Sequence, residues 1–265
     1  MSLAELSLDA ATGIATVTIN RPEVMNAINV PLAEALRDVA LQLRADDARI
    51  RCVVLRGNGR AFVAGGDLAA FAKDFEVADQ VADALLNALH VVVETLRSID
   101  APVIASVHGA VAGAGLSLMG ACDLVIAAQG TRFLIAYDRI GASPDCGGTY
   151  FLPRLLGRNK AAQLMFLSET LDADAALAAG LVYKVVAADA LETATAELAT
   201  QLAKGPTQAY GNYKRLVEQT YDRTLPQQLE AERNAFSANT RTADFREGVS
   251  AFLGKRAAEF KGRGQ

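Results

Sequence analysis

The sequence has few cysteines, no excess of positive charge and no charged residue between positions 101 and 122. Its cysteines, Cys52, Cys122 and Cys146, are too few and too scattered for a disulfide framework or a metal site. We therefore expect no bound metal and a reducing compartment, the cytoplasm. The net charge of −4 provides no overall basic field that would attract nucleic acid, so a small-molecule partner fits better.

The uncharged stretch 101–122 is long enough to suggest a membrane span. It is rich in Gly, Ala and Ser and contains His108, so a buried strand, a glycine turn and a helix explain it better. The first residues, MSLAELSLD, contain two acidic residues and lack a basic segment followed by an apolar block. We therefore expect neither a signal peptide nor an association with a membrane.

Strand-like and helix-like segments alternate through the first half of the chain. Apolar residues at three- and four-residue spacing predict helices over 30–44 and 77–97. The predicted strands are 14–20, 52–58, 102–109 and 123–128. This alternation is typical of βαβ units. After a last strand at 181–186, the residues from about 189 predict three or four helices, which must cover the chain's own core or a neighbouring subunit.

Two glycine-rich segments follow predicted strands. In 59–71, GRAFVAGGDLAAF, a Gly-Gly pair precedes a short apolar helix, and in 108–123, HGAVAGAGLSLMGACD, a Gly-Ala-Gly triplet opens a helix. If their unpaired backbone N–H groups converged, they would form an oxyanion hole for a carbonyl that becomes an enolate. Each segment alone is also compatible with a simple close backbone contact. Neither matches the motif of a nucleoside triphosphate or dinucleotide site.

Four blocks together resemble the enoyl-CoA hydratase/isomerase (crotonase) superfamily over nearly the whole chain. They are NRPEVMNAI at 20–28, AFVAGGDL at 61–68, PVIASVHGAVAGAG at 102–115 and IGASPDCGGTYFLPRLLG at 140–157. The ending at 243–263, ADFREGVSAFLGKRAAEFKGR, most resembles isomerases that open the epoxide ring of epoxyphenylacetyl-CoA, which are similar to Δ3,Δ2-enoyl-CoA isomerases. The resemblance implies an α/β fold with a crotonase-like spiral core of ββα repeats.

The same resemblance implies a division of the chain and an assembly. Residues 1–188 would form the core that binds acyl-CoA, and residues 189–265 would be a helical region for oligomerisation and for covering the active site. The assembly would be a homotrimer or a hexamer. Phe252 and Lys255 match positions that approach the CoA of an adjacent subunit.

Individual roles also follow from the resemblance. The backbone N–H groups of Gly66 and Ala114 would hold the thioester oxygen, and the carboxylate of Asp145 would move the proton. Leu118 and Tyr137 would shape the acyl pocket. The residues expected to line the CoA groove are Met25, Ala27, Ala64, Asp67, Leu68 and Ala69. Coenzyme A would be part of the substrate, so we expect no separate cofactor.

Two positions depart from the hydratase pattern. Hydratases that resemble this chain carry two glutamates, and Ser117 and Tyr137 stand in their places. Adding water requires one group to orient and deprotonate it and another to supply a proton, whereas an allylic isomerisation needs a single base that removes and returns a proton. The sequence therefore predicts an acyl-CoA isomerase that shifts a double bond or opens an epoxide, with an enoyl-CoA hydratase as the alternative.

Other interpretations compete for the same residues. Asp145 could simply cap a helix that begins near Cys146. Dehalogenases of the 4-chlorobenzoyl-CoA type use a histidine at the position of His90 together with an aspartate matching Asp145. Some relatives bind RNA without catalysis, but the acidic balance and the lack of a Lys/Arg-rich helix argue against that function.

Overall fold

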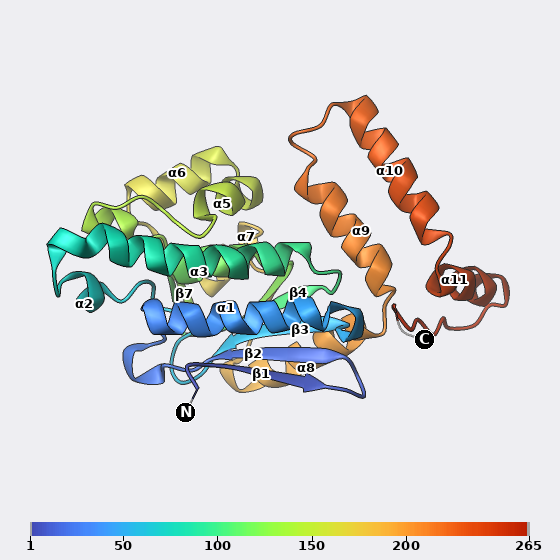
Figure 1. The fold of residues 1–265 in the computed structure, drawn as a ribbon, viewed down its shortest axis with the longest axis horizontal. Helices are drawn as coiled ribbons and strands as arrows, with labels where there is room; N and C mark the ends of the chain where they lie inside the picture. The colour runs from blue at the N-terminus through green and yellow to red at the C-terminus, as the bar shows by residue number, and fades with distance from the viewer. Residues whose placement is uncertain (1, 264–265) are drawn as a thin grey trace.

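The computed structural model describes residues 2–263 and centres on a six-stranded sheet (Figure 1). The sheet order is β1-β2-β3-β4-β6-β9, with β1 and β2 antiparallel and the other neighbours parallel. The strands are β1 (Ala4–Asp9), β2 (Ile14–Ile19), β3 (Cys52–Gly57), β4 (Val103–Val107), β6 (Leu124–Ala128) and β9 (Lys184–Val186). Four of the predicted strands are confirmed, and the one predicted over 181–186 is confirmed only over its second half, β9, whereas β1 was not predicted.

A smaller sheet lies beside the first and has the order β5-β7-β8. Its strands are β5 (Ala110–Ala112), β7 (Arg132–Leu134) and β8 (Thr170–Asp172). β5 continues the chain almost directly from β4, because the left-handed residue Gly109 turns the backbone between them. This change of sheet carries the second glycine-rich segment away from the main sheet.

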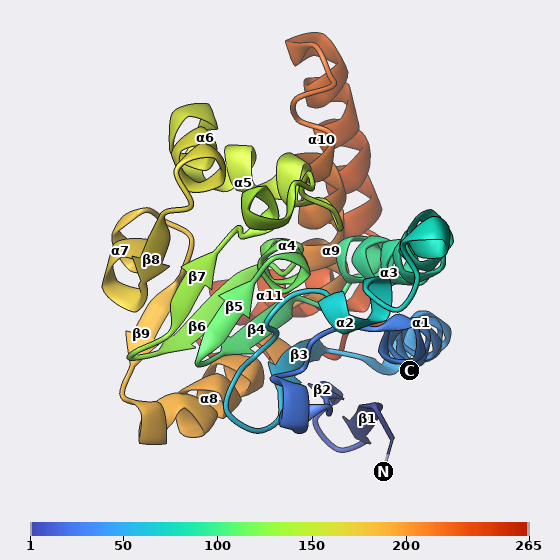
Figure 2. The same ribbon diagram turned by 90° about the vertical axis from the view of Figure 1, so that its left-hand side faces the viewer.

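Helices cover both faces of the main sheet (Figure 2). α1 (Val30–Ala45) and α3 (Ala78–Ser98) pack against each other over one face. α8 (Leu191–Ala203) covers the other, where its Ala199 and Ala203 contact a second apolar cluster that includes Ile104 and Ile126. Because both faces are covered, every residue of β4 is buried, as expected for a parallel strand.

The remaining helices of the body are short. They are α2 (Leu68–Phe71), α4 (Ala114–Gly120), α5 (Gly148–Leu156), α6 (Arg158–Phe166) and α7 (Ala173–Ala178). Single 3₁₀ turns are η1 (Pro22–Val24), η2 (Asp47–Arg49), η3 (Phe75–Val77), η4 (Tyr137–Ile140) and η5 (Ala188–Ala190). All seven residues of α4 are buried, so packing fixes the position of its first residue, Ala114.

Three helices extend away from this body (Figure 1). They are α9 (Thr207–Glu218), α10 (Leu225–Asn239) and α11 (Ala243–Leu253). Together with α8 they make four helices between residue 189 and residue 263, which confirms the prediction of three or four helices in this part of the sequence. α8 packs on the sheet, so the part that projects begins at α9. The roles assigned to residues 1–188 and 189–265 stay predictions. Among residues 2–263, no helix is both long and apolar enough to cross a membrane.

Candidate active site

The two glycine-rich segments touch through their backbones. Gly65 and Gly113 both have positive φ, 109° and 52°, in the region that favours glycine. A Cβ on Gly113 would lie 3.4 Å from the Cα of Gly65. Two hydrogen bonds between Val63 and β5 hold the segments together. The N–H of Val63 donates to the Ala110 carbonyl at 3.2 Å, and the N–H of Ala112 donates to the Val63 carbonyl at 2.9 Å. The residues that follow the two glycines, Gly66 and Ala114, are therefore brought close.

Both of those residues carry an unpaired backbone donor. Within residues 2–263, neither the N–H of Gly66 nor that of Ala114 has a hydrogen-bond acceptor. Ala114 is the first residue of α4, where helix geometry leaves N–H groups without a partner and adds a positive end charge. A Cβ on Gly66 would meet no atom within 4 Å, so open space lies beside this donor. The arrangement can accept an oxyanion.

Asp145 lies beside the second glycine segment. It is half-buried, and its Oδ1 accepts a hydrogen bond from the hydroxyl of the buried Tyr137. A Cβ on Gly113 would lie 3.9 Å from Cζ of Tyr137, so the tyrosine ring stands between the glycine segment and the carboxylate. Burial, reinforced by the charge of Asp145, raises the pKa of Tyr137, and the phenol stays protonated as a donor.

A tight turn fixes the backbone of Asp145. Cys146 and Gly147 have φ of 49° and 81°, and the N–H of Gly148 donates to the Asp145 carbonyl at 2.9 Å. Two left-handed central residues with this hydrogen bond form a type I′ turn. α5 begins at Gly148, and its N-cap is Gly147 without a side-chain cap. The interpretation of Asp145 as a helix cap is therefore wrong, and its carboxylate is available for chemistry.

The hydroxyl and thiol groups near Asp145 are neutral. Ser117 is buried on α4 and packs against the start of α5, since a Cβ on Gly148 would lie 2.5 Å from its Oγ. Burial, together with the charge of Asp145, raises the pKa of the Cys146 thiol. This thiol stays protonated and serves as a packed side chain.

Comparison with known proteins decides the family. Residues 9–263 match the model of the enoyl-CoA hydratase/isomerase family. The protein belongs to this family. It is 38% identical to the 1,2-epoxyphenylacetyl-CoA isomerase of Escherichia coli, over 95% of this chain and 96% of the relative. It is 33% identical to the trans-2-decenoyl-[acyl-carrier-protein] isomerase of Streptococcus mutans, over 99% of this chain and all of the relative.

A solved structure agrees with this assignment. The crystal structure of an enoyl-CoA hydratase from a Polaromonas species superposes with a TM-score of 0.90, at 33% identity, and the match covers 97% of this chain and 99% of that one. The predicted crotonase-like fold is thereby confirmed, and the protein is an enzyme of the enoyl-CoA hydratase/isomerase family. Relatives named as isomerases and as hydratases both occur, so the family alone does not decide the reaction.

The family's expected CoA groove joins two segments far apart in sequence. The N–H of Ala64 donates to the Met25 carbonyl at 3.1 Å. Arg21 links the segments again, because its Nη1 lies 2.8 Å from the Ala27 carbonyl and 2.7 Å from the Asp67 carboxylate. Leu68 and Ala69 are exposed just beyond, on α2. The structure thus brings the predicted lining residues together, while their contact with CoA stays a prediction.

Sequence reasoning missed Arg21 and Asn26 in this groove. Asn26 is fully buried in a left-handed conformation, φ 58°, which asparagine tolerates better than most residues. Its side chain accepts from the N–H of Arg21 and donates to the carbonyls of Asn58, Ala61 and Phe62. These bonds fix the loop that leads into the first glycine segment. The NRPEVMNAI block contained both residues, but it did not reveal which carbonyls they reach.

Of three further predicted residues, one lies near the glycine turns and two lie elsewhere in this chain. Leu118 is buried in the main core on α4, one turn from Ala114. Phe252 is 83% exposed on α11, and Lys255 is exposed just after it. Figure 1 shows α11 and α2 at opposite ends of the molecule. Phe252 and Lys255 are therefore not part of this chain's own site, and their contact with a neighbour's CoA stays a prediction.

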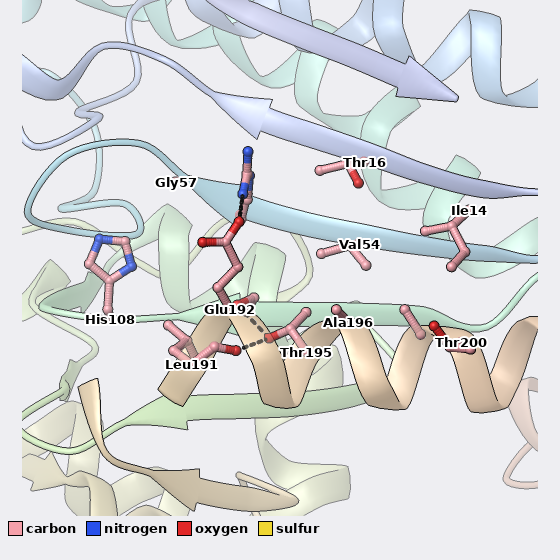
Figure 3. A pocket seen from close by; sticks show the side chains of 13 residues that line it. Ile14, Thr16, Val54, Gly57, His108, Leu191, Glu192, Thr195, Ala196 and Thr200 are labelled. Atoms are coloured by element: carbon pink, nitrogen blue, oxygen red, sulfur yellow. Dashed lines mark hydrogen bonds and ion pairs between the residues drawn. The ribbon is translucent and has the colours of Figure 1, made fainter. Parts of the chain in front are cut away.

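Two further features stand apart from this site. His90 is exposed on α3, and no hydrogen bond within the described residues joins it to Asp145. A separate cavity of about 290 Å³ lies between α8 and strands β2 to β4 (Figure 3). Some of its polar groups pair with one another, as Ser106 Oγ and Thr195 Oγ1 do at 2.9 Å, and none of the predicted site residues lines it. Across residues 2–263, no three His, Cys, Asp or Glu side chains are placed to hold a metal.

Proposed function

We propose that the protein is an acyl-CoA isomerase that shifts a double bond, or opens an epoxide ring, in a CoA thioester. The observation that carries this proposal is the position of Asp145, a carboxylate that the Tyr137 hydroxyl holds, while the ring of the same tyrosine adjoins the second of two touching glycine turns. The two places where resembling hydratases carry glutamate hold the neutral hydroxyls of Ser117 and Tyr137. One base beside an oxyanion site suits an isomerisation better than an addition of water.

The double-bond shift would proceed through an enolate. The thioester oxygen would accept hydrogen bonds from the N–H groups of Gly66 and Ala114. Asp145 would take a proton from the carbon next to the thioester carbonyl. The electron pair of that C–H bond would form a double bond to the carbonyl carbon, and the carbonyl π pair would move onto the thioester oxygen. The conjugated enolate would then recover the proton from Asp145 at the carbon two positions farther along. No atom is gained or lost, and the carboxylate is restored.

The names of the relatives support a thioester isomerase. The Escherichia coli relative is named for an epoxidised acyl-CoA, and the Streptococcus mutans relative for a decenoyl group on acyl carrier protein. Both names describe isomerases of thioesters. They differ in the acyl group, so a panel of substrates is needed to place this enzyme among them.

The test compares Asp145→Asn with a matched control on a panel of CoA thioesters. With the wild type, we expect isomerisation of a 3-enoyl-CoA or of epoxyphenylacetyl-CoA to exceed hydration of a 2-enoyl-CoA. Asn keeps the size of the side chain but cannot accept a proton, so kcat should fall by about 10²-fold or more, while the melting temperature stays close to that of the wild type.

Asp138→Asn is the control, because Asp138 is an exposed carboxylate of η4 held by Ser168. It should leave turnover unchanged. Full isomerase activity in the folded Asp145→Asn protein would refute the proposal. Hydration faster than isomerisation would transfer the assignment to a hydratase, and chloride release from 4-chlorobenzoyl-CoA would transfer it to a dehalogenase.

A further inference from the structure

The contact between Tyr137 and Asp145 assigns different tasks to the two carboxylate oxygens. Oδ1 accepts the hydrogen bond from the Tyr137 hydroxyl. Oδ2 makes no hydrogen bond of normal geometry within residues 2–263, and it does not belong to the buried unpaired atoms. One oxygen is thus held by the Tyr137 hydroxyl. The Cys146 thiol lies near the same carboxylate as a weak donor, and Oδ2 has no stronger partner within residues 2–263.

The tyrosine is held at least as firmly as the aspartate. It is buried, and its ring adjoins Gly113 of the second glycine turn. Its backbone stands between two left-handed residues, Ala136 and Gly141, and its carbonyl accepts from the N–H of Ala142 at 3.0 Å. The hydroxyl therefore has little freedom to leave Asp145, and a fixed donor fixes the rotation of the carboxylate.

A fixed carboxylate matters for a reaction in which one base works at two carbons. The base must remove a proton at one carbon and deliver it two positions farther along, on the same face of the enolate. Rotation of the carboxylate would let either oxygen carry the proton. It would also widen the range of distances and angles between the base and each of the two carbons. A base that is held in the productive orientation reacts faster, because fewer of its orientations are unproductive.

We propose that Tyr137 is the positioning residue of the isomerase, and that by holding Oδ1 of Asp145 it makes Oδ2 the single oxygen that removes and returns the proton. This inference rests on the proposed function. It differs from the role expected from the sequence, in which Tyr137 only shapes the acyl pocket. Tyr137 touches no reacting atom in this assignment and acts through Asp145.

The test is Tyr137→Phe, assayed with a straight-chain 3-enoyl-CoA. Phe keeps the ring that packs on Gly113 and removes only the donor. We expect kcat to fall by about 10- to 100-fold, the effect of losing one hydrogen bond to a charged group, while KM changes less than about threefold. Without the donor the charged carboxylate is less stabilised, so the acidic limb of kcat/KM should move to higher pH.

Two controls separate positioning from packing. Tyr150→Phe removes a hydroxyl that bonds to the Glu218 carbonyl, away from the site, and should change neither kcat nor the pH profile. In the Asp145→Asn background, Tyr137→Phe should lower the residual kcat by less than about twofold, because the two residues act as a unit. A full additional loss there would overturn the assignment.

The outcomes distinguish this inference from the proposed function. If Asp145→Asn is inactive but Tyr137→Phe keeps wild-type kcat and pH profile, the positioning role is refuted and the isomerase assignment stands. If Asp145→Asn is fully active, both fail. If Tyr137→Phe does not fold, 3-fluorotyrosine at position 137 replaces it. That residue keeps the ring and donates more strongly, so the acidic limb should move to lower pH, and an unchanged limb would refute the role.

Discussion

At residue 114 the proposed chemistry depends on a backbone atom. Ala114 is the first residue of α4, and its N–H has no acceptor within residues 2–263. Proline is tolerated at the first position of a helix, so Ala114→Pro deletes the donor with little cost to α4. We expect kcat to fall by about 10²- to 10³-fold, as typically follows the loss of one oxyanion donor.

The matched control for this change is Ala114→Ser, which keeps the N–H and should retain most of the turnover. Circular dichroism and thermal melting check that both variants are folded. Wild-type turnover in a folded Ala114→Pro protein would show that this N–H does not hold the thioester oxygen.

The residues of the site differ in how far the sequence could predict them. Gly66, Ala114 and Asp145 lie in blocks that resemble the family, so their positions were predicted. The bond from Tyr137 to Asp145 was not, because it depends on how the turn at Cys146 and Gly147 aims the carboxylate. Such a bond joins residues whose side-chain directions are set by backbone angles that no composition or periodicity reveals.

At the scale of elements, regular periodicity was the reliable signal. α1 and α3 were predicted because their apolar residues recur at helical spacing over several turns. The three-residue strands β5, β7 and β8 are too short to show a period. The sequence alone groups α8 with the projecting helices. An amphipathic sequence shows that one face of a helix is covered, but it does not show which element covers that face. In the structure that cover is the main sheet.

A buried lysine fastens the projecting helices to the body. Lys214 of α9 is 5% exposed, and its Nζ lies 2.9 Å from the Leu96 carbonyl and 2.9 Å from the carboxylate of Asp123. Burial lowers the pKa of Lys214, and the charge of Asp123 opposes that effect. The ammonium also donates to the carbonyl of Ala101 at 3.1 Å, so one side chain satisfies three acceptors.

We expect Lys214→Met to destabilise the protein by about 3 kcal/mol, because it leaves buried acceptors without a donor and breaks a buried ion pair. The thermal midpoint should fall by about 6–12 °C. Lys204→Met, at an exposed lysine just after α8, should change it by less than about 2 °C. An unchanged midpoint for Lys214→Met would mean that this contact does not hold α9.

At the scale of the whole molecule, the projecting helices expose more apolar surface than a monomer needs. α10 has no buried residue, and its Leu225 and Leu229 are 70% and 55% exposed. Phe252 and Leu253 at the end of α11 are 83% and 75% exposed. Large apolar side chains exposed in pairs on these helices favour an interaction surface. α2, which begins just after Gly66, also lies at the opposite end of the same chain (Figure 1).

These features support the predicted trimer or hexamer, in which Phe252 and Lys255 would approach a neighbour's CoA. Light scattering of the wild type should give a trimeric or hexameric mass. The double variant Leu225→Glu and Leu229→Glu should dissociate it, because charge at an apolar interface must be desolvated, and the KM for acyl-CoA should rise at least about tenfold. Ser237→Glu, which adds a charge at an exposed polar position of the same helix, should change neither property. A stable wild-type monomer with full activity would contradict both the assembly and the role of Phe252 and Lys255 in a neighbouring site.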